Sequence, residues 1–273
     1  MTQTQTVTLA DGGTLNLRID GPEGAPWVVM SNSVMTELSI WERQIGALSN
    51  RYQLLRYDVR GHGASSLPTC PMDFDCYGAD LLAILDTCGI ERCTFVGLSM
   101  GVPTGLAAYA VAPERFEGFV AVDGVARSAP GREGFWAERR ETARASGLAS
   151  IATVTAERWM PGEPTDSPTL KALAAMVAAT PVEGFATATH ALQRYDYAAV
   201  VSRLTCRFLG IFGENDGAMP EAIRKQFGDL PGAAFAEIPG AGHVPNYQNP
   251  DAFNAVLGSF LDAAASEITK ETF

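Results

Sequence analysis

Histidine and cysteine are both scarce in this chain, and each scarcity narrows the chemistry open to it. Among 273 residues there are three histidines and five cysteines. The cysteines, at positions 70, 76, 88, 93 and 206, are odd in number and include no C-x-x-C pair. Such a set favours reduced thiols in a cytoplasmic protein over a disulfide framework. We therefore expect no native bridge, not even between Cys70 and Cys76, which flank a short loop.

Basic residues are outnumbered, and long apolar runs are absent. Twenty Lys and Arg stand against 31 Asp and Glu, for a net charge of −11, so a broad basic surface for nucleic acid is not expected. No run approaches the roughly 20 uncharged apolar residues of a membrane-spanning helix, and the N-terminal residues do not have the pattern of a signal peptide. We expect a cytoplasmic protein without a nucleic-acid or membrane partner. Whether copies associate into a homo-oligomer is not determined by the sequence.

Hydrophobic residues make up 47% of the chain. They occur in alternating strand-like and helix-like segments. Strands are expected at residues 5–10, 14–19, 27–31, 52–58, 93–97, 116–124, 207–216 and 233–240. Helices are expected at residues 38–48, 74–87, 99–112, 220–230 and 250–264, with the last nine residues frayed. The first two strands flank "DGG" and read as a hairpin. The alternation predicts an α/β fold: a mostly parallel, eight-stranded sheet with helices on both faces.

The alternation breaks between residues 125 and 203. This stretch shows helical patterns and Pro/Gly breaks but no convincing strand, and residues 169–180 form a helix pattern between two prolines. We therefore predict two units: a core of residues 1–124 and 204–273, and a helical cap insertion of residues 125–203.

The motif Gly97-Leu98-Ser99-Met100-Gly101 lies where a predicted strand passes into a predicted helix. In that context a G-x-S-x-G motif is typical of a nucleophile elbow, in which the serine occupies a strained turn and bulkier neighbours would collide. Ser99 would also lie at a helix N-terminus, which stabilises developing negative charge. The plain alternative is a strand-to-helix turn without chemistry.

A nucleophilic serine needs a base and an acid, and the order along the chain selects them. His243 follows the last predicted strand and Asp216 the strand before it, so both lie at the sheet edge that carries Ser99. The order Ser99, Asp216, His243 is the one expected of this elbow type. His62 is expected to organise a loop and His190 to be solvated or capping. Asp123, at the end of another strand, is the competing acid, and Glu214 is expected to be a loop residue.

Two backbone amides should form an oxyanion hole. One is that of Met100, after the nucleophile, and the other that of Val34, in the loop after the strand at residues 27–31. These assignments rest on position alone. Asn32 and Ser33, in the same loop, are expected to line the pocket.

These motifs resemble the α/β-hydrolase superfamily and, within it, the 3-oxoadipate enol-lactone hydrolases. The segment at residues 28–66, which includes Ser31-Asn32-Ser33, carries most of the resemblance. "ATPVEGF" in the insertion and "GAGHVPN" around His243 are also similar, and the likeness extends over about residues 5–262. The chain departs from that family at Val102-Pro103, where a second glycine is common, and at Asp123, where an asparagine-like residue is expected.

The resemblance implies a hydrolase of carboxylic ester bonds, an enol-lactonase of aromatic catabolism in the β-ketoadipate pathway. Ser99, activated by His243, would attack the lactone carbonyl, and water would then hydrolyse the acyl-enzyme. No metal or organic cofactor is needed. The free carboxylate of such a lactone calls for cationic or hydrogen-bonding partners. Arg132 is the substrate-binding candidate among six arginines of the insertion (127, 132, 139, 140, 158 and 194), and Trp136 and Trp159 could wall the pocket.

Three other functions stay open at this point. The chain could be a carboxylesterase or lactonase for another small ester, or a hydrolase of carbon–carbon bonds. It could be a cofactor-free perhydrolase or haloperoxidase, which uses the same triad on peroxide. Or it could be a binding module that has kept the fold without catalysis.

Overall fold

The computed structural model describes the backbone of residues 3–271 and the side chains of residues 3–263. One eight-stranded sheet crosses it, in the order β1-β2-β4-β3-β5-β6-β7-β8. β1 and β2 run antiparallel to their neighbours, and the other strands pair in parallel. This confirms the predicted mostly parallel sheet. The strands are β1 (Gln3–Thr8), β2 (Thr14–Asp20), β3 (Trp27–Ser31), β4 (Gln53–Tyr57), β5 (Cys93–Leu98), β6 (Phe116–Val122), β7 (Arg207–Gly213) and β8 (Ala234–Ile238).

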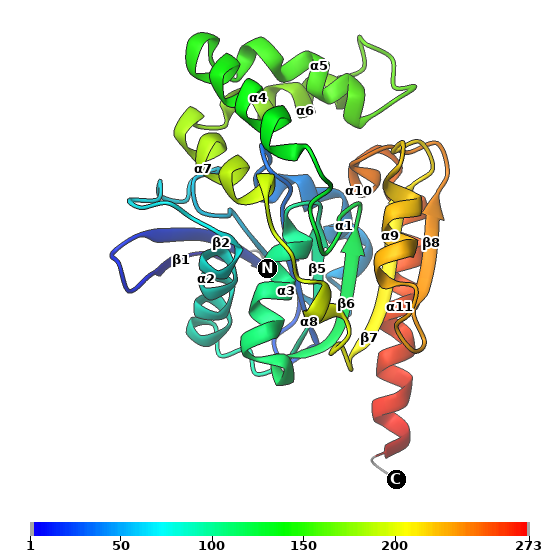
Figure 1. Cartoon of the computed structure of the whole chain (residues 1–273). Coiled ribbons are helices and arrows are strands. Elements are labelled where there is room, and N and C mark those ends of the chain that lie inside the picture. The colour runs from blue at the N-terminus through cyan, green and yellow to red at the C-terminus, as the bar shows by residue number, and fades with distance from the viewer. Residues whose placement is uncertain (1–2, 272–273) are drawn as a thin grey trace.

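Helices cover both faces of the sheet (Figure 1). α2 packs against α3 on one face, and α1 packs against α11 on the other. Every residue of β4 and β5 is buried, as expected for parallel strands that are covered on both sides. The helices of this core are η1 (Leu38–Trp41), α1 (Glu42–Leu48), α2 (Phe74–Thr87), α3 (Gly101–Val111), η2 (Pro113–Arg115), α9 (Met219–Phe227), α10 (Pro245–Gln248) and α11 (Pro250–Glu271).

The stretch between β6 and β7 is helical, as its sequence pattern predicts. It contains α4 (Arg132–Ser146), α5 (Ala149–Trp159), α6 (Pro168–Ala179), α7 (Val182–Gln193) and α8 (Ala198–Val201). α4–α7 lie together above one edge of the sheet (Figure 1). α8 does not join them but packs against α3, and the Tyr109 hydroxyl of α3 donates a hydrogen bond to the carbonyl of Arg203. The last helix of this stretch, α8, therefore lies against the core and not with α4–α7.

Two helix predictions differ from the structure. The segment at residues 38–48 begins with a turn of 3-10 helix, η1, before α1. The final helix was expected to end at residue 264 with frayed residues after it, but α11 continues to Glu271. Its last turns are rich in Ala, Glu and Lys, which have high helix propensity.

No single helix among residues 3–271 has the length and apolar character needed to cross a membrane. α6 and α7 pass that test only as a pair, and they are bent by 93° at the break between them.

Candidate active site

Ser99 occupies a strained turn between β5 and α3. Its φ is +52°, a left-handed conformation that is uncommon for residues other than glycine. A Cβ at Gly97 would lie 2.5 Å from the carbonyl carbon of Gly101, and one at Gly101 would lie 2.6 Å from the carbonyl oxygen of Ser31. Backbone segments therefore approach each other at distances that only glycine permits. Both flanking glycines of the motif are required by this close approach.

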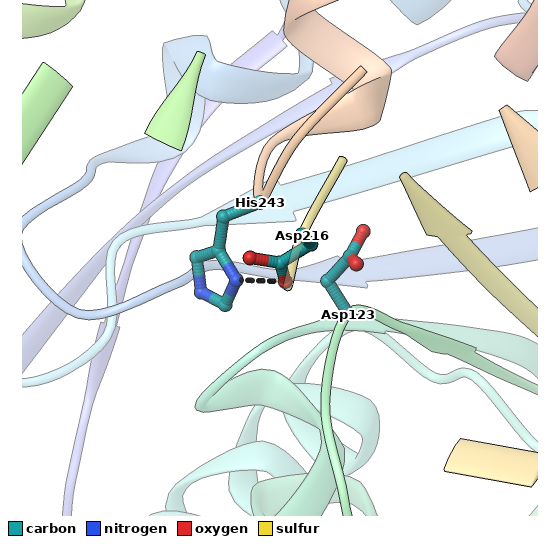
Figure 2. Close-up of side chains that lie close together, drawn as sticks. All are labelled: Asp123, Asp216 and His243. Atoms are coloured by element: carbon teal, nitrogen blue, oxygen red, sulfur yellow. Dashed lines mark hydrogen bonds and ion pairs between the residues drawn. The ribbon is translucent and has the colours of Figure 1, made fainter. Parts of the chain in front are cut away.

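Ser99, His243 and Asp216 form one hydrogen-bonded row. His243 Nε2 lies 2.9 Å from the Ser99 hydroxyl oxygen. Its Nδ1 lies 2.7 Å from Asp216 Oδ2 (Figure 2). The three residues come from the ends of β5, β7 and β8, so the sheet edge brings together side chains 144 positions apart. With Nδ1 bonded to a carboxylate, Nε2 is free to accept a proton from the serine.

Asp123 lies against Asp216 and does not take its place. Figure 2 shows its side chain beside Asp216, and it is Asp216, not Asp123, that accepts the hydrogen bond from His243 Nδ1. Asp123 is fully buried, has a φ of +40°, and accepts a hydrogen bond from the backbone N–H of Gly213 at 3.1 Å. Burial and the neighbouring charge of Asp216 raise the pKa of Asp123 well above its ordinary value.

Helices α4–α7 form a cap, and the end of its helix α5 contacts the loop that carries His243. The rings of Trp159 and His243 lie 5.4 Å apart. Gln248 accepts a hydrogen bond from the Gly242 N–H and donates one to the Pro161 carbonyl. A Cβ at Gly242 would lie 2.7 Å from the Trp159 carbonyl oxygen. The end of α5 and the histidine loop are therefore fixed against each other.

A cavity of about 420 Å³ opens beside Ser99 and His243, within the usual size range of small-molecule sites. Ends of the sheet strands form its floor, with Asp123 and Asp216. The cap forms its roof. Its lining residues include Arg132, Trp136 and Trp159, the candidates named from the sequence, and also Phe135, Arg158, Leu192 and Tyr195.

Three arginines gather around the Phe135 ring in this roof. The guanidinium carbons of Arg132, Arg139 and Arg158 lie 4.4, 5.3 and 5.8 Å from its centroid. Burial and the charges of Arg158 and Arg132 lower the pKa of Arg139 to about 10. Desolvation also lowers the pKa of Arg132, and desolvation and the Arg132 charge lower that of Arg158. The cap ion pairs within the described residues, Arg127–Asp196 and Arg144–Glu183, leave this cluster unneutralised.

Two residues that were expected in the pocket lie elsewhere. Asn32 is fully buried; its amide donates to the Tyr57 carbonyl and accepts from the Trp41 indole, so it holds the core together. Ser33 is also buried and does not line the cavity. The Asn32 side chain could not be placed from the sequence, because its partners Tyr57 and Trp41 lie in other segments. Val34, the next residue, does line the cavity, and Met100 is the N-cap residue of α3.

The remaining histidines lie away from this row. His62 is fully buried in the loop after β4, and burial lowers its pKa to about 4, which fits a loop-organising role. His190 is exposed on α7. Glu214 accepts a hydrogen bond from the Gly240 N–H, as a loop residue would. All five cysteines are unpaired.

Sequence reasoning missed Phe135 and Gln248 and did not single out Arg158. Nothing in the local sequence marks Gln248, because its partners lie in another part of the chain. Arg158 and Phe135 are separated by 23 positions, and only the packing of α4 on α5 brings them together.

Asp123, Asp216 and His243 also offer ligand atoms within 4.8 Å of one another. His243 uses Nδ1 for Asp216, and Nε2 faces Ser99. We therefore interpret this cluster as a hydrogen-bonded network and not as a metal centre.

Comparisons with known proteins agree with this architecture. The chain is 34% identical over 249 residues to 3-oxoadipate enol-lactonase 2 of Acinetobacter baylyi, covering 90% of this chain and 92% of that protein. The crystal structure of the enol-lactonase from Burkholderia xenovorans superposes with a TM-score of 0.87 at 32% identity, covering 95% of this chain and all of that one. A hydrolase structure from Pseudomonas aeruginosa gives 0.86 at 30% identity, over 95% and 98% of the two chains.

The family model for the alpha/beta hydrolase family matches residues 24–256. This span includes the elbow serine, the acid and the histidine as well as the whole cap. Together with the relatives above, it confirms the resemblance to enol-lactone hydrolases that the motifs carry. The chain belongs to the alpha/beta hydrolase family.

Proposed function

We propose that this protein is a serine hydrolase that opens a small carboxylate-bearing lactone, 3-oxoadipate enol-lactone, through an acyl-enzyme. The observation that carries the proposal is the hydrogen-bonded row Ser99–His243–Asp216 on the floor of a cavity with a cationic roof. The names of the relatives from Acinetobacter baylyi and Burkholderia xenovorans support the choice of substrate.

The reaction would proceed in two halves. His243 Nε2 accepts the Ser99 proton as the serine oxygen attacks the lactone carbonyl, and the negative oxygen that forms accepts hydrogen bonds from the amides of Val34 and Met100. The ring C–O bond then breaks, the departing enol oxygen takes the proton, and the enol converts to a ketone. Water, deprotonated by the same histidine, attacks the acyl-enzyme and releases the acid and Ser99.

The roof of the cavity fits the carboxylate of this substrate. In a chain of net charge −11, Arg132 and Arg158 both line the cavity without a carboxylate partner among the described ion pairs. Trp136 Nε1 is buried and has no hydrogen-bond partner in the described residues. Charge-assisted hydrogen bonds from such donors to a carboxylate are short and strong. A bound carboxylate would also offset the desolvation that lowers the pKa values of Arg132 and Arg158, and the charge of Arg132 that adds to it at Arg158.

The first test is Ser99→Ala, measured by the loss of ultraviolet absorbance of the enol-lactone. We expect kcat to fall about 10⁴-fold or more, because removal of a triad nucleophile leaves only binding and oxyanion stabilisation. Ser150→Ala, at an exposed position of the cap, is the matched control and should keep normal turnover. Full turnover by Ser99→Ala would exclude the proposed mechanism.

A substrate panel tests the choice of lactone. Efficient cleavage of neutral nitrophenyl esters without turnover of the enol-lactone would favour a carboxylesterase, and bromination of monochlorodimedone with acetate and peroxide would favour a perhydrolase. Turnover of the enol-lactone well above that of the neutral esters is the expected result.

We also propose a cytoplasmic location. The five unpaired thiols support it, since an oxidising compartment favours disulfides. Enol-lactone hydrolysis there would belong to the breakdown of aromatic compounds.

A further inference from the structure

The acidic side chain next to the catalytic row has no role in the mechanism described above. Asp123 is 0% exposed and lies at the end of β6, directly beside Asp216. Ligand oxygens of the two carboxyl groups and a nitrogen of His243 all lie within 4.8 Å of one another (Figure 2). The ion pair at this site is formed by His243 and Asp216, so Asp123 has no cation of its own there.

Two adjacent buried carboxyl groups beside a single imidazole cannot both be ionised without a large cost in free energy. Like charges in contact at a buried position cost so much that one member of the pair keeps its proton. Asp216 is 18% exposed, whereas Asp123 is enclosed. The proton should therefore reside on Asp123, the more deeply buried member.

We infer that Asp123 is a neutral carboxylic acid whose O–H donates a hydrogen bond to Asp216, which makes it a positioning residue for the triad. Its other contact, the Gly213 N–H, anchors it to β7, the strand that carries Asp216. Asp216 would then accept hydrogen bonds on both sides, from His243 Nδ1–H and from Asp123. This inference rests on the proposed function, since it assigns the residue to the same catalytic row.

The charged and titratable groups that face Asp123 support this reading. They are Asp216 after β7 and His243 after β8; Arg158 of α5 acts on Asp216. Burial is the first cause, and the Asp216 charge the second, of the raised pKa of Asp123; the Gly213 N–H opposes them in part.

The sign of the pH dependence follows from that direction. In the proposed state Asp123 keeps its proton at neutral pH, and since burial and the Asp216 charge raise its pKa, it loses that proton only as the pH rises. Ionisation would remove its hydrogen bond to Asp216 and place two negative charges in contact. Activity should therefore decline at alkaline pH through Asp123.

Comparing Asp123→Leu with Asp123→Asn distinguishes a hydrogen-bond donor at this position from a side chain that only fills the volume. Leu fills the site but cannot donate, and we expect kcat at pH 7 to fall about 10- to 100-fold, as for a lost hydrogen bond to a charged group. Asn keeps a donor without a titrating proton. It should recover most of that loss and shift the alkaline limb of kcat/KM to higher pH. Glu214→Gln, which alters a nearby exposed loop acid, should leave that limb in place.

An infrared measurement provides a readout that needs no turnover. In Ser99→Ala protein labelled with ¹³C-aspartate, a protonated carboxylic C=O band should be present at pH 7 and absent after the further change Asp123→Asn. This arm holds even if the variants at position 123 turn over poorly, and it is independent of the Ser99→Ala test of the proposed function. Absence of the band, or alkaline limbs that coincide in wild type and Asp123→Asn, would overturn the inference.

Discussion

The floor and the roof of the cavity differ in charge and in how their side chains are positioned. The floor consists of strand ends, where Ser99, Asp216 and His243 are placed by backbone geometry and by hydrogen bonds of 2.7 and 2.9 Å. The roof includes helices α4 and α5, where three arginines surround the Phe135 ring without ion-pair partners among the described residues. The floor is acidic and carries the proposed reacting groups, while the roof is cationic. We interpret the difference as a separation of chemistry from substrate recognition.

The largest expected effect separates the two acids of the floor. Asp216→Asn should lower kcat by about 10⁴-fold, because the imidazole loses the partner that fixes its tautomer and stabilises its charge. Steady-state kinetics on the enol-lactone would measure this. Asp123→Asn should lose far less at pH 7. If Asp123→Asn proved the more damaging change, Asp123 would be the triad acid and our assignment would be wrong.

The roof should affect binding of the carboxylate rather than the chemical step. Arg132→Met removes one cation from the cavity while keeping much of the side-chain volume. We expect KM for the enol-lactone to rise about 10- to 100-fold, in line with loss of a charge-assisted hydrogen bond, with kcat little changed.

Two comparisons control the Arg132 experiment. Arg144→Met, on the same helix but paired with Glu183 at the surface, should leave KM unchanged. A neutral nitrophenyl ester should lose nothing on Arg132→Met. An equal loss for the neutral ester would mean that Arg132 supports the structure of the cap and does not bind a carboxylate.

The smallest expected effect concerns the seam between roof and core. Gly184, the third residue of α7, lies so close to the core that an added Cβ would be 1.8 Å from the Gly61 carbonyl oxygen. Gly184→Ala should cost about 1 to 3 kcal/mol of unfolding free energy, because backbone must shift to relieve the overlap. Denaturant unfolding would measure it.

Gly134 offers a matched control for this substitution. It is the third residue of α4, and nothing lies within 4 Å of an added Cβ there. Gly134→Ala should be neutral or stabilise slightly, since alanine favours a helix over glycine. If both substitutions behaved alike, the close approach of cap and core at Gly184 would not be a constraint in solution.

The sequence predicted the part of the molecule that follows from local patterns. Runs such as Trp27–Ser31 and Cys93–Leu98 were recognisable as buried strands because their apolar residues are continuous. The elbow around Ser99 was recognisable because the tight turn leaves no space for a Cβ at either flanking position, so glycines occur at a fixed spacing from the serine. The positions of Asp216 and His243 followed from one rule, that ends of parallel strands share an edge.

The prediction was weaker wherever a residue's role depends on what packs against it. Asn32 and Ser33 were expected in the pocket, but a loop can turn its side chains either way. Here both are buried, and Asn32 forms hydrogen bonds within the core. Arg158 looked like any other arginine of a solvated helix. The end of α11 was misplaced because the helix propensity of its last turns was given too little weight.

By itself, then, the sequence determined the strands of the sheet, their order along the chain and the serine, acid and histidine candidates. These follow from local patterns, from chain order and from the rule that the ends of parallel strands share an edge. Only the tertiary structure decided that Asp216 and not Asp123 meets His243, that Asp123 is enclosed beside it, and that three arginines converge on Phe135. Those outcomes depend on burial and on the packing of α4 against α5, which bring together residues far apart in the chain.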